Sequence, residues 1–129
     1  MIVLDASAAV ELLLGTPGRL AFLSGALSDP HWVVPEHFVL EVASGARGAW
    51  LGGDINDREF DGVLSALAGL SLDVWPTRPL LPRIRSLAEN ATTYDAAYVA
   101  LAEELGIALV TTDRKLARIP HIHCTVIQP

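Results

Sequence analysis

The sequence is poor in cysteine and in basic residues, and it has no long hydrophobic run. Cys124 is the single cysteine among 129 residues, so no disulfide can form within the chain, and this composition suits a reducing compartment. No apolar stretch reaches the roughly 18 residues of a membrane-spanning helix. The apolar opening lacks the basic start of a signal peptide and is interrupted by Asp5 and Glu11. We therefore expect a cytoplasmic protein that does not enter a membrane.

The charge balance argues against a general nucleic-acid binder. Nine Lys and Arg residues face fifteen Asp and Glu residues, a formal net charge of -6, whereas proteins that bind nucleic acids without selectivity are usually basic. A nuclease remains compatible with this charge, because divalent cations can offset acids gathered in an active site. No linker, repeat or low-complexity tract divides the chain, so we expect one domain over residues 1–129.

Apolar periodicity predicts strands and helices in alternation. Strands are expected at 2–5, 32–34, 72–75, 108–111 and 125–127. Helices are expected at 6–14, 17–27, 36–51, 57–68, from Pro79 or Pro82 to residue 89, and at 94–105, with a helical turn at 114–117. Strands separated by helices indicate an α/β fold in which a parallel sheet is covered on both faces.

Four acidic residues are placed where such a fold brings active-site groups together. Asp5 and Asp113 follow predicted strands, whose carboxyl ends share one edge of the sheet, and Glu41 and Asp95 belong to neighbouring helices. Each acid also has a structural interpretation. Asp5 and Asp113 could cap helices, Asp95 could form a capping box with Thr92, and Glu41 could be a solvated surface acid. Together the four favour a carboxylate cluster, which cannot remain fully ionised without a cation.

A carboxylate cluster predicts a magnesium-dependent reaction. Mg²⁺ prefers hard oxygen ligands, and a bound Mg²⁺ can acidify a water that then attacks a phosphodiester. The hydroxyls of Ser7, Thr111 and Thr112 lie next to Asp5 and Asp113 in the sequence. We expect them either to orient ligands and waters around the metal or to serve as helix caps and turn residues.

Several segments resemble the PIN-domain ribonucleases, in particular the VapC toxins of type II toxin-antitoxin pairs. These segments are IVLDASAAVELL, the central Glu41, TTYDAAYVALAEELGIALVTTDRKLA and the terminal strand. The resemblance implies a three-layer α/β/α sandwich around a central parallel sheet. It also implies endonucleolytic cleavage of RNA that depends on Mg²⁺ or Mn²⁺, with catalysis assigned to Asp5, Glu41, Asp95 and Asp113.

The resemblance carries further implications for the metal and for partners. Asp5, Asp95 and Asp113 would be the metal ligands. Many relatives have another acid about four residues after the last of these, where this chain has Ala117, so a second metal site is left open. A cognate VapB-type antitoxin, a toxin homodimer and a toxin-antitoxin hetero-oligomer are the implied assemblies.

The substrate is expected to be single-stranded or loop RNA, because a splayed strand can present its phosphate to a shallow acidic site. The basic residues expected to hold flanking phosphates are Arg83, Arg85, Arg114, Lys115 and Arg118. Two other functions stay open. One is a magnesium-dependent phospho-aspartate domain of receiver or haloacid-dehalogenase type, although the latter expects a second Asp where this chain has Ser7. The other is an inert interaction module.

One further motif, His121-x-His123 followed by Cys124, resembles a metal-binding tract. No fourth ligand stands at a suitable spacing. We therefore interpret His121 and His123 as surface histidines on the last strand.

Overall fold

Five parallel strands form the centre of the protein, which a computed structural model describes at residues 1–15, 21, 24–25 and 28–129. The sheet has the order β3-β2-β1-β4-β5, and every neighbouring pair is parallel. The strands are β1 (Ile2–Leu4), β2 (Trp32–Pro35), β3 (Asp73–Trp75), β4 (Leu109–Val110) and β5 (Val126–Ile127). The predicted parallel α/β sheet is confirmed, with the first strand of the chain at its middle.

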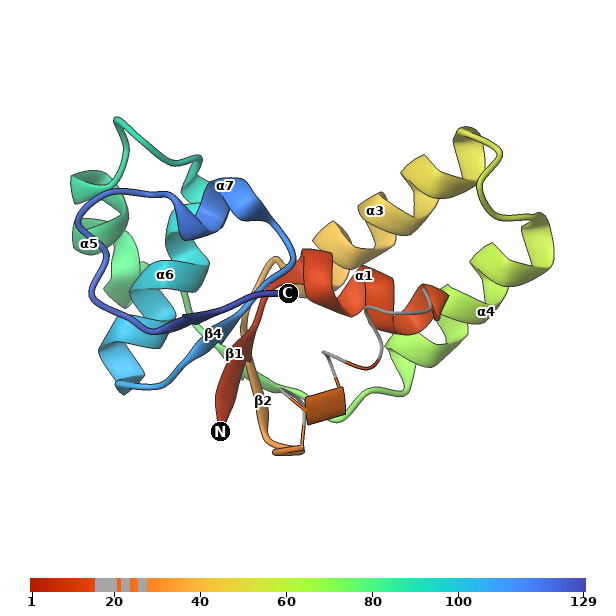
Figure 1. Ribbon diagram of the computed structural model, residues 1–129, viewed down its shortest axis with the longest axis horizontal. Helices are drawn as coiled ribbons and strands as arrows, with labels where there is room; N and C mark the ends of the chain where they lie inside the picture. Colours follow the sequence, from red (N-terminus) through yellow and green to blue (C-terminus); the bar gives the residue numbers. More distant parts are fainter. Residues whose placement is uncertain (16–20, 22–23, 26–27) are drawn as a thin grey trace.

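Helices cover the sheet on both sides (Figure 1). They are α1 (Ala6–Leu14), α3 (Phe38–Leu51), α4 (Asp57–Ala68), α5 (Leu81–Ser86), α6 (Thr93–Leu105) and α7 (Arg114–Ala117), with a 3-10 turn η1 (Arg78–Leu80) before α5. Helix α6 contacts β1, β2 and β4, and α5 packs beside it; α1, α3 and α4 contact one another on the opposite side. This arrangement is the predicted three-layer sandwich.

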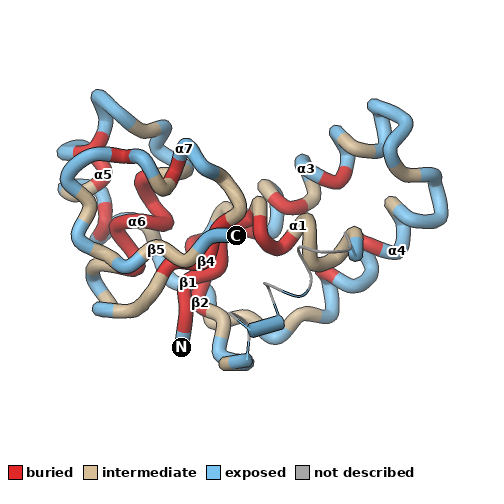
Figure 2. Tube along the Cα trace, in the orientation of Figure 1, coloured by how far each residue is buried: buried red, intermediate tan, exposed pale blue. Residues whose placement is uncertain are grey.

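Helix α6 is the most deeply buried helix among the described residues. Its residues 96–102 are all buried, and Figure 2 shows the same burial along β1 and β4, whereas the far ends of α3 and α4 are exposed. The Thr92 hydroxyl accepts a hydrogen bond from the Asp95 N–H, which starts the helix, and Gly106 ends it with a φ of 64°. The anchored start of α6 fixes the position of Asp95.

The observed elements differ from the predicted ones mainly at their ends. Helix α3 begins at Phe38 instead of residue 36, because β2 extends to Pro35 and residues 36 and 37 form a turn. Helix α5 stops at Ser86 instead of residue 89, and β4 has only two residues. His121 and His123 are exposed as expected, but they precede β5 and do not lie on a strand. Most of the helix expected at 17–27 lies outside the described residues.

One local feature was not anticipated. Asn56 and Glu59 form a reciprocal capping box at the start of α4, with the Asn56 side chain accepting from the Glu59 N–H at 2.8 Å. No helix in the described part of the chain is long and apolar enough to cross a membrane.

Candidate active site

The site is built at the carboxyl ends of β1, the central strand, and its neighbour β4. These strands are paired with Leu4 opposite Val110, so the residues that follow them leave the sheet side by side. The Asp5 N–H continues the ladder by donating to the Val110 carbonyl at 2.9 Å. Asp5 and the segment from Thr111 to Asp113 are therefore held at one edge of the sheet.

All four predicted acids line one cavity of about 300 Å³. Asp5 follows β1, Glu41 comes from α3, Asp95 from the first turn of α6, and Asp113 from the residue before α7. The cavity is lined by Asp5, Ala6, Ser7, Val10, Glu41, Gly45, Asp95 and Asp113. Residues more than a hundred positions apart in the sequence thus share one small space, as the strand-end argument predicted.

Asp5 is the buried member of the cluster, with 3% of its surface exposed. Its side chain does not cap α1. Its Oδ2 accepts hydrogen bonds from the hydroxyls of Ser7 and Thr111, the latter at 2.7 Å. Burial raises the pKa of Asp5, and these two hydroxyls act in the opposite direction by stabilising the charged form.

The same hydroxyls tie β1 to the loop after β4. Ser7 Oγ accepts from the Thr112 N–H at 3.1 Å, and Thr111 Oγ1 accepts from the Asp113 N–H at 3.0 Å. Thr112 therefore takes part through its backbone, whereas Ser7 and Thr111 take part through their side chains. This network fixes both Asp5 and the backbone that carries Asp113.

Asp113 and Asp95 combine a helix-start position with a place in the cavity. Asp113 Oδ1 accepts from the Lys115 N–H at 2.8 Å, so the capping role considered for Asp113 is real and coexists with its place in the cluster. The pKa of Asp95 is raised by burial and by the charges of Asp5 and Asp113, and Lys115 offsets part of that increase.

Glu41 has the most strongly perturbed carboxyl in the cavity. Burial raises its pKa to about 7, with further contributions from the charges of Asp5 and Asp95. The Tyr98 hydroxyl donates to Glu41 Oε1 at 3.1 Å and opposes this shift. A carboxyl with a pKa near neutrality, next to other carboxylates in a cavity, is typical of a functional site.

The donor set fits a divalent cation. The cavity offers hard oxygen donors, and burial raises the pKa values of three of its carboxyls, those of Asp5, Glu41 and Asp95. Neighbouring negative charges raise the pKa values of Glu41 and Asp95 further. Across residues 1–15, 21, 24–25 and 28–129, no three His, Cys, Asp or Glu side chains are placed to hold a metal ion simultaneously. Magnesium keeps several waters and commonly takes only one or two carboxylates directly, so it does not require such a group.

The predicted phosphate-binding residues fall into two sets. Arg114 and Lys115 of α7 and Arg118 just after it are exposed, and all three lie within five residues after Asp113 in the sequence. Arg83 instead forms an ion pair with Glu103, with Nε 2.7 Å from Oε2, and also donates to the His121 carbonyl. Arg85 is exposed on α5.

Three residues around the cavity were missed by the sequence analysis. Gly45 lies one helical turn after Glu41, and a Cβ there would come within 2.9 Å of a Val10 methyl, so its small size allows α3 to approach α1. Tyr98 lies one turn after Asp95. His37 precedes Glu41 by one turn. Helical spacing from the acids was the available signal for all three.

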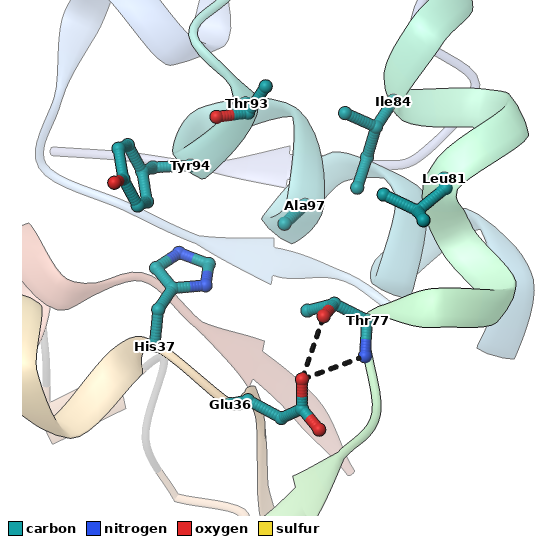
Figure 3. Close-up of a pocket in the computed structure, with 8 residues that line it drawn as sticks. All are labelled: Glu36, His37, Thr77, Leu81, Ile84, Thr93, Tyr94 and Ala97. Atoms are coloured by element: carbon teal, nitrogen blue, oxygen red, sulfur yellow. Dashed lines mark hydrogen bonds between the residues drawn. The ribbon is translucent and has the colours of Figure 1, made fainter.

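A second hollow of about 230 Å³ is lined by residues of α5 and α6 and by the residues just before α3 (Figure 3). His37 projects toward Tyr94 of α6, whereas Glu36 turns away and accepts hydrogen bonds from the Thr77 N–H and hydroxyl. Leu81, Ile84 and Ala97 give this hollow an apolar wall. It contains none of the four clustered acids and is therefore not the site of their chemistry.

Comparison with known proteins identifies the family. The PIN domain family model matches residues 2–122. Ribonuclease VapC12 of Mycobacterium tuberculosis is 44% identical over 120 residues, which are 92% of this chain and 91% of the relative. Two solved structures share the fold. One is VapC20 of Mycobacterium tuberculosis, described as a toxin that cleaves the sarcin-ricin loop, with a TM-score of 0.65 and 17% identity; the match covers 91% of this chain and 93% of that one. The other is VapBC2 of Rickettsia felis bound to a promoter DNA fragment, with a TM-score of 0.67 and 14% identity; the match covers 99% of this chain and 98% of that one.

The family match extends over nearly the whole chain and includes each element that carries a clustered acid. It supports neither the receiver nor the dehalogenase alternative. The structural neighbours have the same layered α/β fold around a parallel sheet. This chain belongs to the PIN-domain family and, within it, to the VapC ribonucleases.

Proposed function

We propose that this protein is a metal-dependent endoribonuclease that acts as the toxin of a toxin-antitoxin pair. The observation that carries the proposal is the cavity in which carboxylates from four separate elements meet. Its support from relatives is the 44% identity to ribonuclease VapC12. In this proposal Asp5, Asp95 and Asp113 hold Mg²⁺ or Mn²⁺, one or two of them directly and the rest through waters of the ion. When bound, the ion would acidify a water and neutralise charge on the phosphodiester.

The side chains around the cavity have different roles in this proposal. Ser7 and Thr111 hold Asp5 in one orientation through its Oδ2, and the backbone network places Asp113 beside it. Asp95 closes the cluster from α6. Glu41, with a pKa of about 7, is suited to take up a proton from an attacking water near neutral pH. No protein nucleophile is required, so the hydroxyls of Ser7 and Thr111 act in positioning.

The proposed substrate is single-stranded or loop RNA. Its support is an acidic cavity at a sheet edge, together with three exposed cations within five residues after Asp113. Arg114, Lys115 and Arg118 would hold phosphates on either side of the cleaved one. Arg85 is a further candidate from α5.

The direct test is incubation of metal-free protein with total RNA, with and without magnesium, followed by mapping of the cut ends. We expect discrete cuts in unpaired regions only when magnesium or manganese is present. Cleavage at the same rate in the presence of a chelator would contradict the metal-dependent mechanism. Cuts confined to perfectly paired duplex would contradict the substrate assignment.

The proposed protein partner is a small VapB-type antitoxin. The Rickettsia felis neighbour is a VapBC2 complex, and an acidic cavity favours a basic partner side chain. We expect an Arg or Lys of the antitoxin to pair with the clustered carboxylates and block the metal. The purified complex should cut RNA more slowly than the free protein, and replacing that basic residue with Ala should restore cleavage. Equal rates for the complex and the free protein would show that inhibition works differently.

We also propose a homodimer, within a larger assembly with the antitoxin. Its support is exposed apolar surface beside the active site. Leu40 is 77% exposed and Tyr94 59%, and both line one hollow next to Glu41. Light scattering of the purified protein should give twice the monomer mass. The Leu40→Asp protein should give the mass of a single monomer. A monomer at micromolar concentration would refute this part of the proposal.

A further inference from the structure

The two tyrosines of the chain lie one turn apart on α6 and contact the same histidine. The His37 ring packs edge to face against Tyr94, with centroids 5.3 Å apart, and against Tyr98, with centroids 5.1 Å apart. Figure 3 shows His37 pointing toward Tyr94. The two tyrosines differ in burial, because Tyr94 is 59% exposed whereas Tyr98 is fully buried.

The tyrosines also differ in what their hydroxyls contact. The Tyr98 hydroxyl donates to Glu41 Oε1 at 3.1 Å, across 57 positions of sequence. Among the described residues, the Tyr94 hydroxyl makes no such bond to a clustered acid. The Tyr98 hydrogen bond therefore joins α6, on one face of the sheet, to α3 on the other.

The other carboxylate oxygen of Glu41, Oε2, is held less firmly than Oε1. His37 Nε2 lies 3.8 Å from Glu41 Oε2, which is beyond hydrogen-bond distance, and this buried nitrogen has no hydrogen-bond partner in the described structure. Asp5 is different, because two hydroxyls hold its Oδ2. For Glu41, the hydroxyl of Tyr98 takes the part that Ser7 and Thr111 take for Asp5.

We propose that Tyr98 is a positioning residue of the active site, whose hydroxyl holds the Glu41 carboxyl in a fixed orientation at the wall of the acidic cavity. This inference rests on the proposed ribonuclease function, because it assumes that Glu41 takes part in cleavage. A glutamate side chain has several rotatable bonds, and holding it in one rotamer before the substrate arrives removes an entropic cost from the reaction. The buried ring of Tyr98, packed on His37, supplies a rigid base for that hydrogen bond.

Tyr98→Phe tests the inference because it removes one oxygen and keeps the ring that packs on His37. We expect kcat to fall about tenfold, the equivalent of one hydrogen bond to a charged group, with KM within twofold of the original value. Tyr94→Phe is the matched control, since it removes the hydroxyl of the other tyrosine that touches His37. Its kcat and KM should be unchanged. A Tyr98→Phe protein that cleaves at the original rate, or an equal loss in both variants, would overturn the inference.

A double-substitution cycle separates positioning from a general structural role. If Tyr98 acts through Glu41, Tyr98→Phe should change kcat less than twofold in a Glu41→Ala background. An undiminished loss in that background would show that Tyr98 acts through something else.

A second cycle uses urea unfolding of the metal-free protein and needs no catalysis. Tyr98→Phe should lower the unfolding midpoint when Glu41 is present and should not lower it in the Glu41→Ala background. Equal shifts in both backgrounds would show that the hydrogen bond is absent in solution and would overturn the inference. This measurement tests whether Tyr98 acts through Glu41 even if the Glu41→Ala protein cleaves RNA too slowly to follow.

The two proposals fail in different ways. If the proposed function is wrong, the unsubstituted protein will not cleave RNA in the presence of magnesium. If only the role of Tyr98 is wrong, the unsubstituted protein will cleave, and Tyr98→Phe will cleave equally well.

Discussion

Helix α6 carries an acidic residue near each end, and their surroundings are opposite. At the start of the helix, burial and the charges of Asp5 and Asp113 raise the pKa of Asp95. Near its end, burial acts to raise the pKa of Glu103, but hydrogen bonds from Arg83 and from the His123 N–H outweigh it and lower that pKa. Eight residues, about 12 Å of helix, separate the two acids.

The contrast between Asp95 and Glu103 shows how to distinguish a functional acid from a structural one. Glu103 is half-buried, but a guanidinium and a backbone N–H compensate its charge, so it stabilises the fold without a further ligand. Asp95 has other carboxylates as its charged neighbours, together with a single lysine. Such an arrangement costs stability and is understandable where a cation or a reaction makes use of it.

Replacing Asp95 should have the largest effect. Asp95→Asn keeps the size of the side chain and deletes its charge, so we expect at least a hundredfold loss of cleavage rate, about 3 kcal/mol in the barrier. Asp5→Asn should behave similarly. The folded structure should persist, because fewer like charges remain in the cavity. Assays of RNA cleavage at saturating magnesium measure the rate, and circular dichroism measures whether the protein stays folded. Glu104→Gln on the exposed face of α6 is the control. Near-normal cleavage by Asp95→Asn would refute the proposed site.

Glu103→Gln should give the reverse pattern. The substitution weakens the bidentate contact with Arg83, so we expect a loss of about 1–2 kcal/mol in the free energy of unfolding. RNA cleavage per folded molecule should be unchanged, because Glu103 lies at the other end of the helix. Urea denaturation measures the loss of stability, and initial cleavage rates measure whether activity is unchanged. A Glu103→Gln protein of normal stability and low activity would break the distinction between the two ends of α6.

The pH dependence of stability should reveal the cluster in the metal-free protein. The native pKa of Glu41, about 7, lies above the ordinary value of 4.5, so the native state binds more protons than the unfolded state between these pH values. The contribution of Glu41 should therefore destabilise the protein as the pH rises from about 5 to 7.5. We expect a decrease on the order of 5 °C in the melting temperature relative to Glu41→Gln over this range.

Magnesium should reverse the decrease at the high end of this pH range, because it binds the native cluster and not the unfolded chain. Melting curves at pH 5 and 7.5, with and without millimolar magnesium, provide the measurement. No magnesium-dependent shift at pH 7.5 would count against a cluster that binds the ion.

The sequence was sufficient to place three of the four acids because each of these three stands at a position that the fold constrains. Asp5 and Asp113 follow strands whose carboxyl ends must share a sheet edge, and Asp95 opens a helix with a clear cap and a clear end. The contacts that could not be predicted depend on packing between distant elements. Tyr98 reaches Glu41 only because α3 and α6 meet at the cavity, and Arg83 reaches Glu103 only because α5 packs on α6.

Element ends were predicted less well for a related reason. Helix α3 begins late because β2 extends to Pro35, which pairs with Trp75 of β3, 40 positions away in the sequence. His121 adopts a positive φ of 63° before β5, which a histidine seldom does and which local sequence does not signal. Local patterns thus determined which elements exist, whereas long-range contacts determined where they stop.

Substitutions of basic residues should have the smallest effects. Lys115 is exposed on α7 and lies close enough to Asp95 to lower the pKa of its carboxyl. Lys115→Ala should therefore raise KM for RNA about threefold and make KM less dependent on salt, with kcat nearly unchanged. Arg83→Ala should instead lower the unfolding midpoint and leave KM unaltered, because Arg83 is occupied by Glu103 and the His121 carbonyl. Arg58→Ala on α4, an exposed cation that does not line the cavity, controls for net charge. If Arg83→Ala raises KM as much as Lys115→Ala does, RNA extends to the far end of α6, and the division between a catalytic end and a structural end fails.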